Sequence, residues 1–296
     1  MGSKLEGVLI ANITPMDDAG ESVDFAGLER LCRTFLDWGA NGLVPLGSTG
    51  EGMLLTDAER EAVTEAVVAV AKGRGTVIVG CTAVTTGKVI SYAKTAERQG
   101  ADAVLVAPPP YIRPAPDEMA YHYKAIAAAV DIPVVIYNNP KRCGVEVSAA
   151  LLARLSEVPN LRHVKESAGN IGKLAENTRL SGGRVQVLNG NDDTALEGML
   201  LGAAGVISGP GNVIVRELAK TLPRVTDLAK RAQAYEEYAH GQAFADYLAT
   251  CRYVPTLKAA VRLMGLPAGG PRRPLLPLSE AEETGLRAFM TKHGLI

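Results

Sequence analysis

The chain has 296 residues, of which 47% are hydrophobic and 21% are charged, and this ordinary balance excludes a globally disordered protein. The 31 basic and 32 acidic residues give a formal net charge of -1, so neither a nucleic acid nor an anionic membrane is an expected partner. The four cysteines are scattered without a C-x-x-C pair, which excludes a disulfide scaffold and favours the reduced cytoplasm. The stretch Met1–Glu6 has no apolar signal core, so export is not expected.

Short apolar runs alternate with longer amphipathic runs along most of the chain. The predicted strands are Val8–Ile13, Gly42–Leu46, Thr76–Gly80, Ala103–Val106, Pro133–Tyr137, Leu161–Lys165, Arg184–Leu188 and Gly205–Ile207. The predicted helices between them are Asp24–Trp38, one beginning at the Thr56–Glu59 capping box, Val84–Gln99, Asp117–Val130, Ser148–Ser156, Ile171–Arg179 and Asp192–Leu201. After about Asn212 we expect the helices Val215–Ala245, Tyr253–Met264 and Ser279–His293, with Gly265–Pro277 as a connector.

Strict alternation of strand and helix predicts an α/β fold with a parallel sheet, and about eight strands favour a closed TIM (β/α)8 barrel over an open sheet. We therefore expect a barrel over residues 1–222 and a C-terminal helical extension over 223–296, packed on the barrel as one structural unit. The uncharged stretch Gly198–Val215 just reaches the ~18 residues of a membrane span. Its glycines and Pro210 favour a helix end, a strand and a loop instead.

Active sites of such barrels lie at the carboxyl ends of the strands, and Lys165 ends the sixth predicted strand. A lysine that points into a barrel loses solvation, which favours the neutral amine that attacks carbonyls to form an imine. An ion pair at the barrel mouth, for example with Glu166, is the alternative. Tyr137 ends the preceding strand, where its phenol could transfer protons to and from the carbonyl oxygen. It could equally be an aromatic side chain held by one hydrogen bond.

The turn Gly47–Glu51 follows the second strand, and its N–H groups and two hydroxyls could bind a carboxylate, although any tight turn has a similar pattern. Arg142 could clamp a second carboxylate, although a solvated surface position is the default for arginine. The segment Gly209–Asn212 could instead bind a phosphate, with Pro210 removing one donor.

The sequence gives no support for a metal site. Its histidines, His122, His163, His240 and His293, are scattered without metal-ligand spacing. A helix N-cap accounts for Asp192, and Cys143 is interpreted as a side chain that fills space near the site.

Four motifs occur together in one order and spacing: Leu46–Glu51, Tyr137–Pro140, Arg142 with Gly144, and Val164–Glu166. Together they closely resemble the dihydrodipicolinate synthase / N-acetylneuraminate lyase family of class I aldolases, from about Gly7 to Pro277. The resemblance implies that Lys165 forms the imine, that Tyr137 relays protons, and that Ser48 is its hydroxyl partner. It also implies that Tyr111 completes this relay from a neighbouring subunit, in a homodimer or homotetramer.

The resemblance further implies the substrate-binding residues. Thr49 with Gly47 and the rest of the turn would bind the pyruvate carboxylate, with Ile207 beside it, and Arg142 would bind the carboxylate of aspartate semialdehyde. The best candidate is therefore a Schiff-base lyase that condenses pyruvate with aspartate semialdehyde, as a 4-hydroxy-tetrahydrodipicolinate synthase does, without a metal or organic cofactor.

Other activities remain open at this point. They are a 2-keto-3-deoxy sugar acid aldolase or dehydratase, an N-acetylneuraminate lyase-like aldolase, a hydroxyproline-pathway 2-oxo acid deaminase, and a non-catalytic 2-oxo acid-binding protein. The turn reads Gly-Ser-Thr where the synthases usually have Gly-Thr-Thr, and Cys143 stands where threonine is usual. Gly52, Met53, Arg60 and Pro110 replace the residues that bind lysine in lysine-inhibited members, so we expect no inhibition by lysine.

Overall fold

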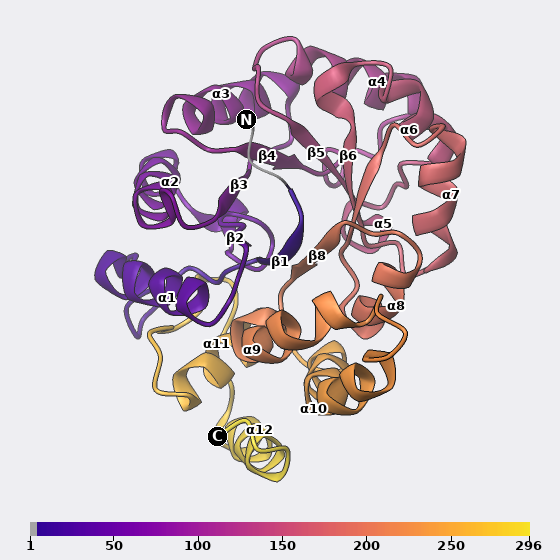
Figure 1. The fold of residues 1–296 in the computed structure, drawn as a ribbon. Helices are drawn as coiled ribbons and strands as arrows, with labels where there is room; N and C mark the ends of the chain where they lie inside the picture. The colour runs from indigo at the N-terminus through magenta and orange to yellow at the C-terminus, as the bar shows by residue number, and fades with distance from the viewer. Residues whose placement is uncertain (1–4) are drawn as a thin grey trace.

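Eight parallel strands close into a barrel in chain order, which confirms the predicted TIM barrel (Figure 1). The computed structural model describes residues 5–296, so Met1–Lys4 of the N-terminal stretch discussed above lie outside it. The strands are β1 (Gly7–Ile10), β2 (Gly42–Leu43), β3 (Thr76–Gly80), β4 (Ala103–Val106), β5 (Val134–Asn138), β6 (His163–Glu166), β7 (Gln186–Asn189) and β8 (Gly205–Ser208). β1 pairs with both β2 and β8, which closes the sheet.

Helices cover the outside of the barrel and extend beyond it at the carboxyl end of the chain. The barrel helices are α1 (Phe25–Asp37), α2 (Asp57–Ala71), α3 (Thr86–Arg98), α4 (Pro116–Ala127), the single-turn α5 (Pro140–Cys143), α6 (Ala149–Leu155), α7 (Gly172–Leu180), α8 (Ala195–Leu200) and α9 (Gly211–Thr221). They are followed by α10 (Arg231–Ala249), α11 (Tyr253–Leu263) and α12 (Glu280–Lys292), which lie together beside α9 in Figure 1. Both predicted capping boxes form, at Thr56 and at Ser279.

Some predicted boundaries are wrong for identifiable reasons. The single helix expected over Val215–Ala245 is two helices, because Pro223 cannot continue α9 and the chain turns before α10 begins at Arg231. The predicted loop at the end of the stretch Gly198–Val215 is already the first part of α9. Across residues 5–296, none of the helices is both long and apolar enough to cross a membrane.

Alternating residues of each strand face the barrel interior and the surrounding helices. The interior cluster includes Leu9, Ile78, Val135, Leu188 and Ile207. The strand residues between them, such as Ile136 and Val164, belong to the larger cluster under the helices. This alternation also decides where polar side chains at the carboxyl ends of the strands can point.

Asn212 at the start of α9 links the loops that follow the first and last strands of the barrel. Its buried side chain accepts a hydrogen bond from the Ile13 N–H at 3.0 Å and donates to the Ala11 and Gly209 carbonyls at 2.9 and 2.7 Å. The loop after β1 is thereby fastened to the loop after β8. A single amide thus pairs with three buried backbone groups, as polar groups in the interior require.

Replacing Asn212 by alanine should lower the free energy of unfolding by about 2–4 kcal/mol, because the Ile13 N–H loses its acceptor inside the protein. Urea unfolding followed by circular dichroism measures the change. The control is Asn170→Ala. It removes an exposed loop side chain that accepts a hydrogen bond from the Gly172 N–H, and it should lower the free energy of unfolding by less than about 1 kcal/mol. Equal effects of the two substitutions would contradict the role given to Asn212.

Candidate active site

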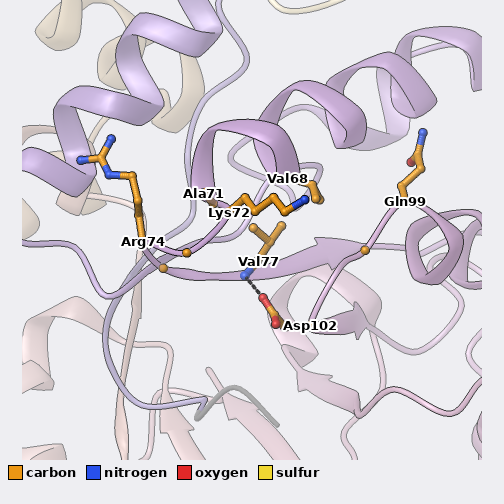
Figure 2. Close-up of a pocket in the computed structure, with 10 residues that line it drawn as sticks. Val68, Ala71, Lys72, Arg74, Val77, Gln99 and Asp102 are labelled. Atoms are coloured by element: carbon orange, nitrogen blue, oxygen red, sulfur yellow. Dashed lines mark hydrogen bonds between the residues drawn. The ribbon is translucent and has the colours of Figure 1, made fainter. Parts of the chain in front are cut away.

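A cavity of about 480 Å³ lies at the amino ends of β3 and β4, beside the loops that follow α2 and α3. Figure 2 shows Lys72, Arg74 and Asp102 at its wall, with the Asp102 carboxylate accepting a hydrogen bond from the Val77 N–H at 2.8 Å. Catalytic groups of these barrels lie at the opposite ends of the strands. This cavity is therefore not the candidate active site.

Two cavities lie at the carboxyl ends of the strands, with volumes of about 520 and 690 Å³. They share four lining residues, Ser48, Tyr137, Arg142 and Tyr253. The smaller cavity is also lined by Thr49, Lys165, Ile207, Asp192 and Lys141, and the larger by Gly47 and by apolar side chains such as Leu46 and Leu105. The structure therefore brings together every predicted site residue except Tyr111.

Lys165 lies on β6 and is buried, and its Nζ is 4.5 Å from the centre of the Tyr137 ring. The two residues are direct partners in the pairing of β5 with β6, so both side chains face the interior at one level. Glu166 follows on the opposite face of the strand. Its carboxylate accepts hydrogen bonds from the side-chain amides of Asn138 and Asn177 and from the Ala168 N–H. The alternative interpretation of Lys165 as an ion-pair partner of Glu166 is therefore wrong.

Tyr137 is buried at the end of β5, and its hydroxyl oxygen accepts a hydrogen bond from the Asn139 side-chain amide at 2.8 Å. Burial alone would raise the pKa of this phenol. The positive charge of Lys165 and the hydrogen bond from Asn139 outweigh burial, so the pKa of Tyr137 lies below its ordinary value. Arg142 and Ser48 shift the pKa in the same direction. A phenol with a lowered pKa thus lies next to the amine of Lys165.

The turn Gly47–Glu51 adopts a conformation that few residues tolerate. Leu46 and Glu51 at its two ends have φ angles of 61° and 56°, in the left-handed region that disfavours side chains. A Cβ on Gly50 would lie 2.9 Å from the Asn12 carbonyl oxygen and from the Leu46 nitrogen, so only glycine fits there. Ser48 on this turn lines both cavities, and the buried Thr49 lines the smaller one.

A buried ion pair fixes the end of this turn. The Glu51 carboxylate lies 2.7 Å from Nζ of Lys258 on α11, and both side chains are only 1% exposed. Lys258 also donates to the Gly270 carbonyl, and the Arg272 N–H donates to the second Glu51 oxygen, each at 2.7 Å. Burial lowers the pKa of Lys258, and the Glu51 charge opposes this shift. Lys258 was not predicted from the sequence, although a single lysine in the apolar run Val254–Val261 is a recognisable signal.

Arg142 lies on the single-turn helix α5 at the mouth of both cavities. Its guanidinium is 5.5 Å from the centre of the Tyr253 ring, and the Tyr253 hydroxyl lies 3.4 Å from Oγ1 of Thr49. Burial raises the pKa of the Tyr253 phenol, so it stays protonated. Tyr253 comes from the first position of α11 and was predicted only as part of a helix. Burial raises the pKa of the neighbouring Cys143 thiol to about 11, which agrees with a space-filling role.

Asp192 has a different role from the predicted helix cap. The cap position before the short 3-10 helix Asp192–Thr194 is Asn191, which makes no side-chain capping bond. The Asp192 carboxylate instead accepts a hydrogen bond from the Ser208 hydroxyl. Burial raises its pKa to about 6, and the hydrogen bond and the charge of Lys165 oppose that shift. Asp192 is therefore an acidic wall of the Lys165 cavity.

The proposed phosphate site at Gly209–Asn212 does not fit the structure. The N–H groups of Gly211, Asn212 and Val213 donate to the Ser208 hydroxyl and to the carbonyls of Gly209 and Pro210. These three N–H groups already have acceptors within the chain, so the segment begins α9 and does not offer them to an anion.

Tyr111 lies apart from the other predicted residues. Its side chain is 93% exposed and its φ angle is 74°, so a strained loop holds the ring away from its own chain. Its neighbour Pro110 lines the larger cavity, but Tyr111 lines neither. Within one chain Tyr111 is therefore not part of the site.

Comparisons with known proteins agree on one family. The model of the dihydrodipicolinate synthetase family matches residues 4–293. A 4-hydroxy-tetrahydrodipicolinate synthase of Acidiphilium cryptum is 38% identical, and the match covers 98% of this chain and 99% of the relative. The structure of the chloride-inhibited dihydrodipicolinate synthase from Acinetobacter baumannii in complex with pyruvate has a TM-score of 0.94 at 33% identity, covering 99% and 100% of the two chains. A lysine-bound enzyme from Cyanidioschyzon merolae is 29% identical, with a TM-score of 0.93 and coverage of 98% and 99%.

Replacing Lys258 by methionine should lower the free energy of unfolding by about 3–5 kcal/mol, because the Glu51 charge would remain buried without its partner. The double variant Lys258→Met/Glu51→Gln should recover part of this loss. The control is Arg262→Met, which breaks the partly exposed pair of α11 with Glu283 and should cost less than about 1 kcal/mol. If urea unfolding gave the same small loss for Lys258→Met as for Arg262→Met, the anchoring role would be refuted.

Proposed function

Because this chain belongs to the dihydrodipicolinate synthetase family, we propose that it is a Schiff-base lyase that condenses pyruvate with aspartate semialdehyde. The observation that carries the proposal is the pair Lys165 and Tyr137, buried face to face at the carboxyl ends of neighbouring strands. Imine formation needs an amine that attacks the carbonyl carbon and an acid that transfers protons to the carbonyl oxygen. Lys165 and Tyr137 provide these two groups side by side.

The reaction begins when the neutral Lys165 amine attacks the keto carbon of pyruvate. The nitrogen gives up its two protons as the C=N bond forms, and Tyr137 passes them on to the former carbonyl oxygen, which leaves as water and gives the imine. Loss of a proton from the methyl group converts the imine to an enamine, a carbon nucleophile that adds to the aldehyde. Hydrolysis or cyclisation of the product then returns the amine. The lysine itself provides the electron sink, so these steps require no metal or organic cofactor.

The surroundings of the pair suit a 2-oxo acid. The Ser48 and Thr49 hydroxyls, with the backbone of the turn at Gly47, would bind the pyruvate carboxylate, and Ile207 would form the apolar wall beside it. The related Acinetobacter baumannii structure was determined with pyruvate, which supports this first substrate. Ser48 also lies where its hydroxyl influences Tyr137, consistent with a place in the proton relay.

Arg142 favours a second substrate that carries its own carboxylate. Its guanidinium is exposed at the shared mouth of the two cavities, where it can bind a carboxylate through two hydrogen bonds. Aspartate semialdehyde carries a carboxylate in addition to its aldehyde group. The sugar-acid and deaminase alternatives lack a comparable observation in their favour.

We also propose that the chain acts in the cytoplasm as a homodimer or homotetramer. The exposed Tyr111 ring follows Pro110, which lines the largely apolar cavity of about 690 Å³ that also contains Tyr137. A Tyr111 side chain from a second copy would enter this cavity and complete the relay through Ser48 and Tyr137.

Borohydride treatment in the presence of pyruvate should attach a reduced pyruvyl group to Lys165, as located by peptide mass mapping. Lys165→Ala should lose the adduct because the attacking amine is gone. Lys141→Ala, which removes an exposed lysine of the same cavity, is the matched control and should keep the adduct. Absence of any adduct with pyruvate and with a panel of 2-oxo acids would leave a binding protein as the better interpretation.

Free lysine should not slow the condensation. Arg60 stands at one of the positions that bind lysine in lysine-inhibited members. Its guanidinium donates to the Gly52 and Gly80 carbonyls and lies 4.0 Å from the centre of the Tyr92 ring, so a fixed cation already occupies this position. A second cation would be repelled there. The measurement is the initial rate of condensation over a series of lysine concentrations at constant ionic strength. A saturable loss of rate would contradict the prediction.

A further inference from the structure

Asn139 connects two parts of the site that the sequence motifs treat separately. It is buried at the start of α5, where its Oδ1 accepts a hydrogen bond from the Arg142 N–H at 3.2 Å. Its Nδ2 donates to the Tyr137 hydroxyl oxygen at 2.8 Å. A backbone N–H can only donate, so it fixes which end of the amide is oxygen and which is nitrogen. The bond to Tyr137 must therefore run from Asn139 to the phenol.

An ordinary helix cap would not need this second bond. Asparagine is favoured at such positions for its oxygen alone, which binds an N–H of the first turn. Here the nitrogen end is also buried and needs an acceptor of its own. The phenol oxygen provides it, and the hydroxyl hydrogen of Tyr137 is then directed away from Asn139, toward the cavity that contains Ser48 and Lys165.

We propose that Asn139 is a positioning residue for the proton relay: its amide orients the Tyr137 hydroxyl toward the reacting carbonyl oxygen and stabilises the phenolate that forms after proton donation. This inference rests on the proposed function, because the relay is a step of imine formation. The same side chain connects the relay to the short helix that carries Arg142. Tyr137, which would protonate the first substrate, is thereby fixed relative to Arg142, which would bind the second.

The groups that face Tyr137 come from several elements. Lys165 on β6 and Arg142 on α5 bring positive charge, Tyr253 on α11 is a protonated phenol, and the buried Cys143 thiol lies in the same cluster. Asp192, which lines the smaller cavity, helps to raise the pKa of Tyr253, and the charge of Lys165 lowers the pKa of Asp192 against the effect of burial. Among these groups Asn139 contributes a donor without a charge, so its removal can be tested without changing the net charge of the site.

The test compares two variants with the unmodified protein. Asn139→Ser keeps an oxygen that can cap α5 but lacks the amide donor, and Asn139→Val lacks both. Without the donor the phenolate is less stable, so the pKa of Tyr137 should rise in both variants. The titration is followed by tyrosinate absorbance, as the difference between each protein and its Tyr137→Phe counterpart. The single-turnover rate of imine trapping with pyruvate should fall about tenfold, with little change in half-saturating pyruvate.

The control is Ser148→Ala, which removes the cap of the next helix, α6, by the same loss of an oxygen acceptor. It should change thermal stability without moving the Tyr137 titration or the trapping rate. If Asn139→Ser titrated and reacted like the unmodified protein, Asn139 would be only a cap and the proposal would be refuted. The titration needs no pyruvate. A protein that forms no adduct at all would therefore refute the proposed function while still reporting on the Asn139 to Tyr137 bond.

Discussion

The in-register pairing of parallel strands β5, β6 and β7 is the constraint on which the site depends. It puts Tyr137, Lys165 and Leu188 side by side, and strand alternation turns all three toward the barrel interior. A slip of one residue would exchange Lys165 for Glu166 at the cavity and bury the carboxylate where the amine belongs. The hydrogen bonds from Asn138 and Asn177 to Glu166 stabilise the observed register from the outer face.

The turn that carries Ser48 and Thr49 depends on a second constraint, which comes from the other end of the chain. Left-handed backbone at Leu46 and Glu51 costs about 1–3 kcal/mol per residue, so the turn persists only where its surroundings hold it. Lys258 and the Arg272 N–H stabilise the turn by binding the Glu51 carboxylate. Since α11 also brings Tyr253 to the mouth of the candidate site, this C-terminal helix helps to shape the site as well as to cover the barrel.

How far the sequence could predict this molecule follows from the range of each interaction. Strand order, the capping boxes at Thr56 and Ser279 and the position of Lys165 depend on local sequence patterns, and these predictions agree with the structure. The short α5 was missed because four residues show no helical period, and the break before α10 was missed because apolar spacing continued across Pro223. Lys258 and Tyr253 reach the site through tertiary packing more than 200 residues from the turn that they contact, which no local pattern encodes.

The electrostatic setting of Tyr137 explains why a neutral donor such as Asn139 suits the proposed relay. Lys165 lowers the pKa of the phenol while it is charged, but its charge changes as ammonium, free amine and imine succeed one another. A relay adjusted by Lys165 alone would therefore be altered by the chemistry that it serves. The amide of Asn139 carries no charge and is not protonated or deprotonated in these steps, so it remains a hydrogen-bond donor throughout. It thus provides the part of the environment that stays constant while the charges around the phenol change.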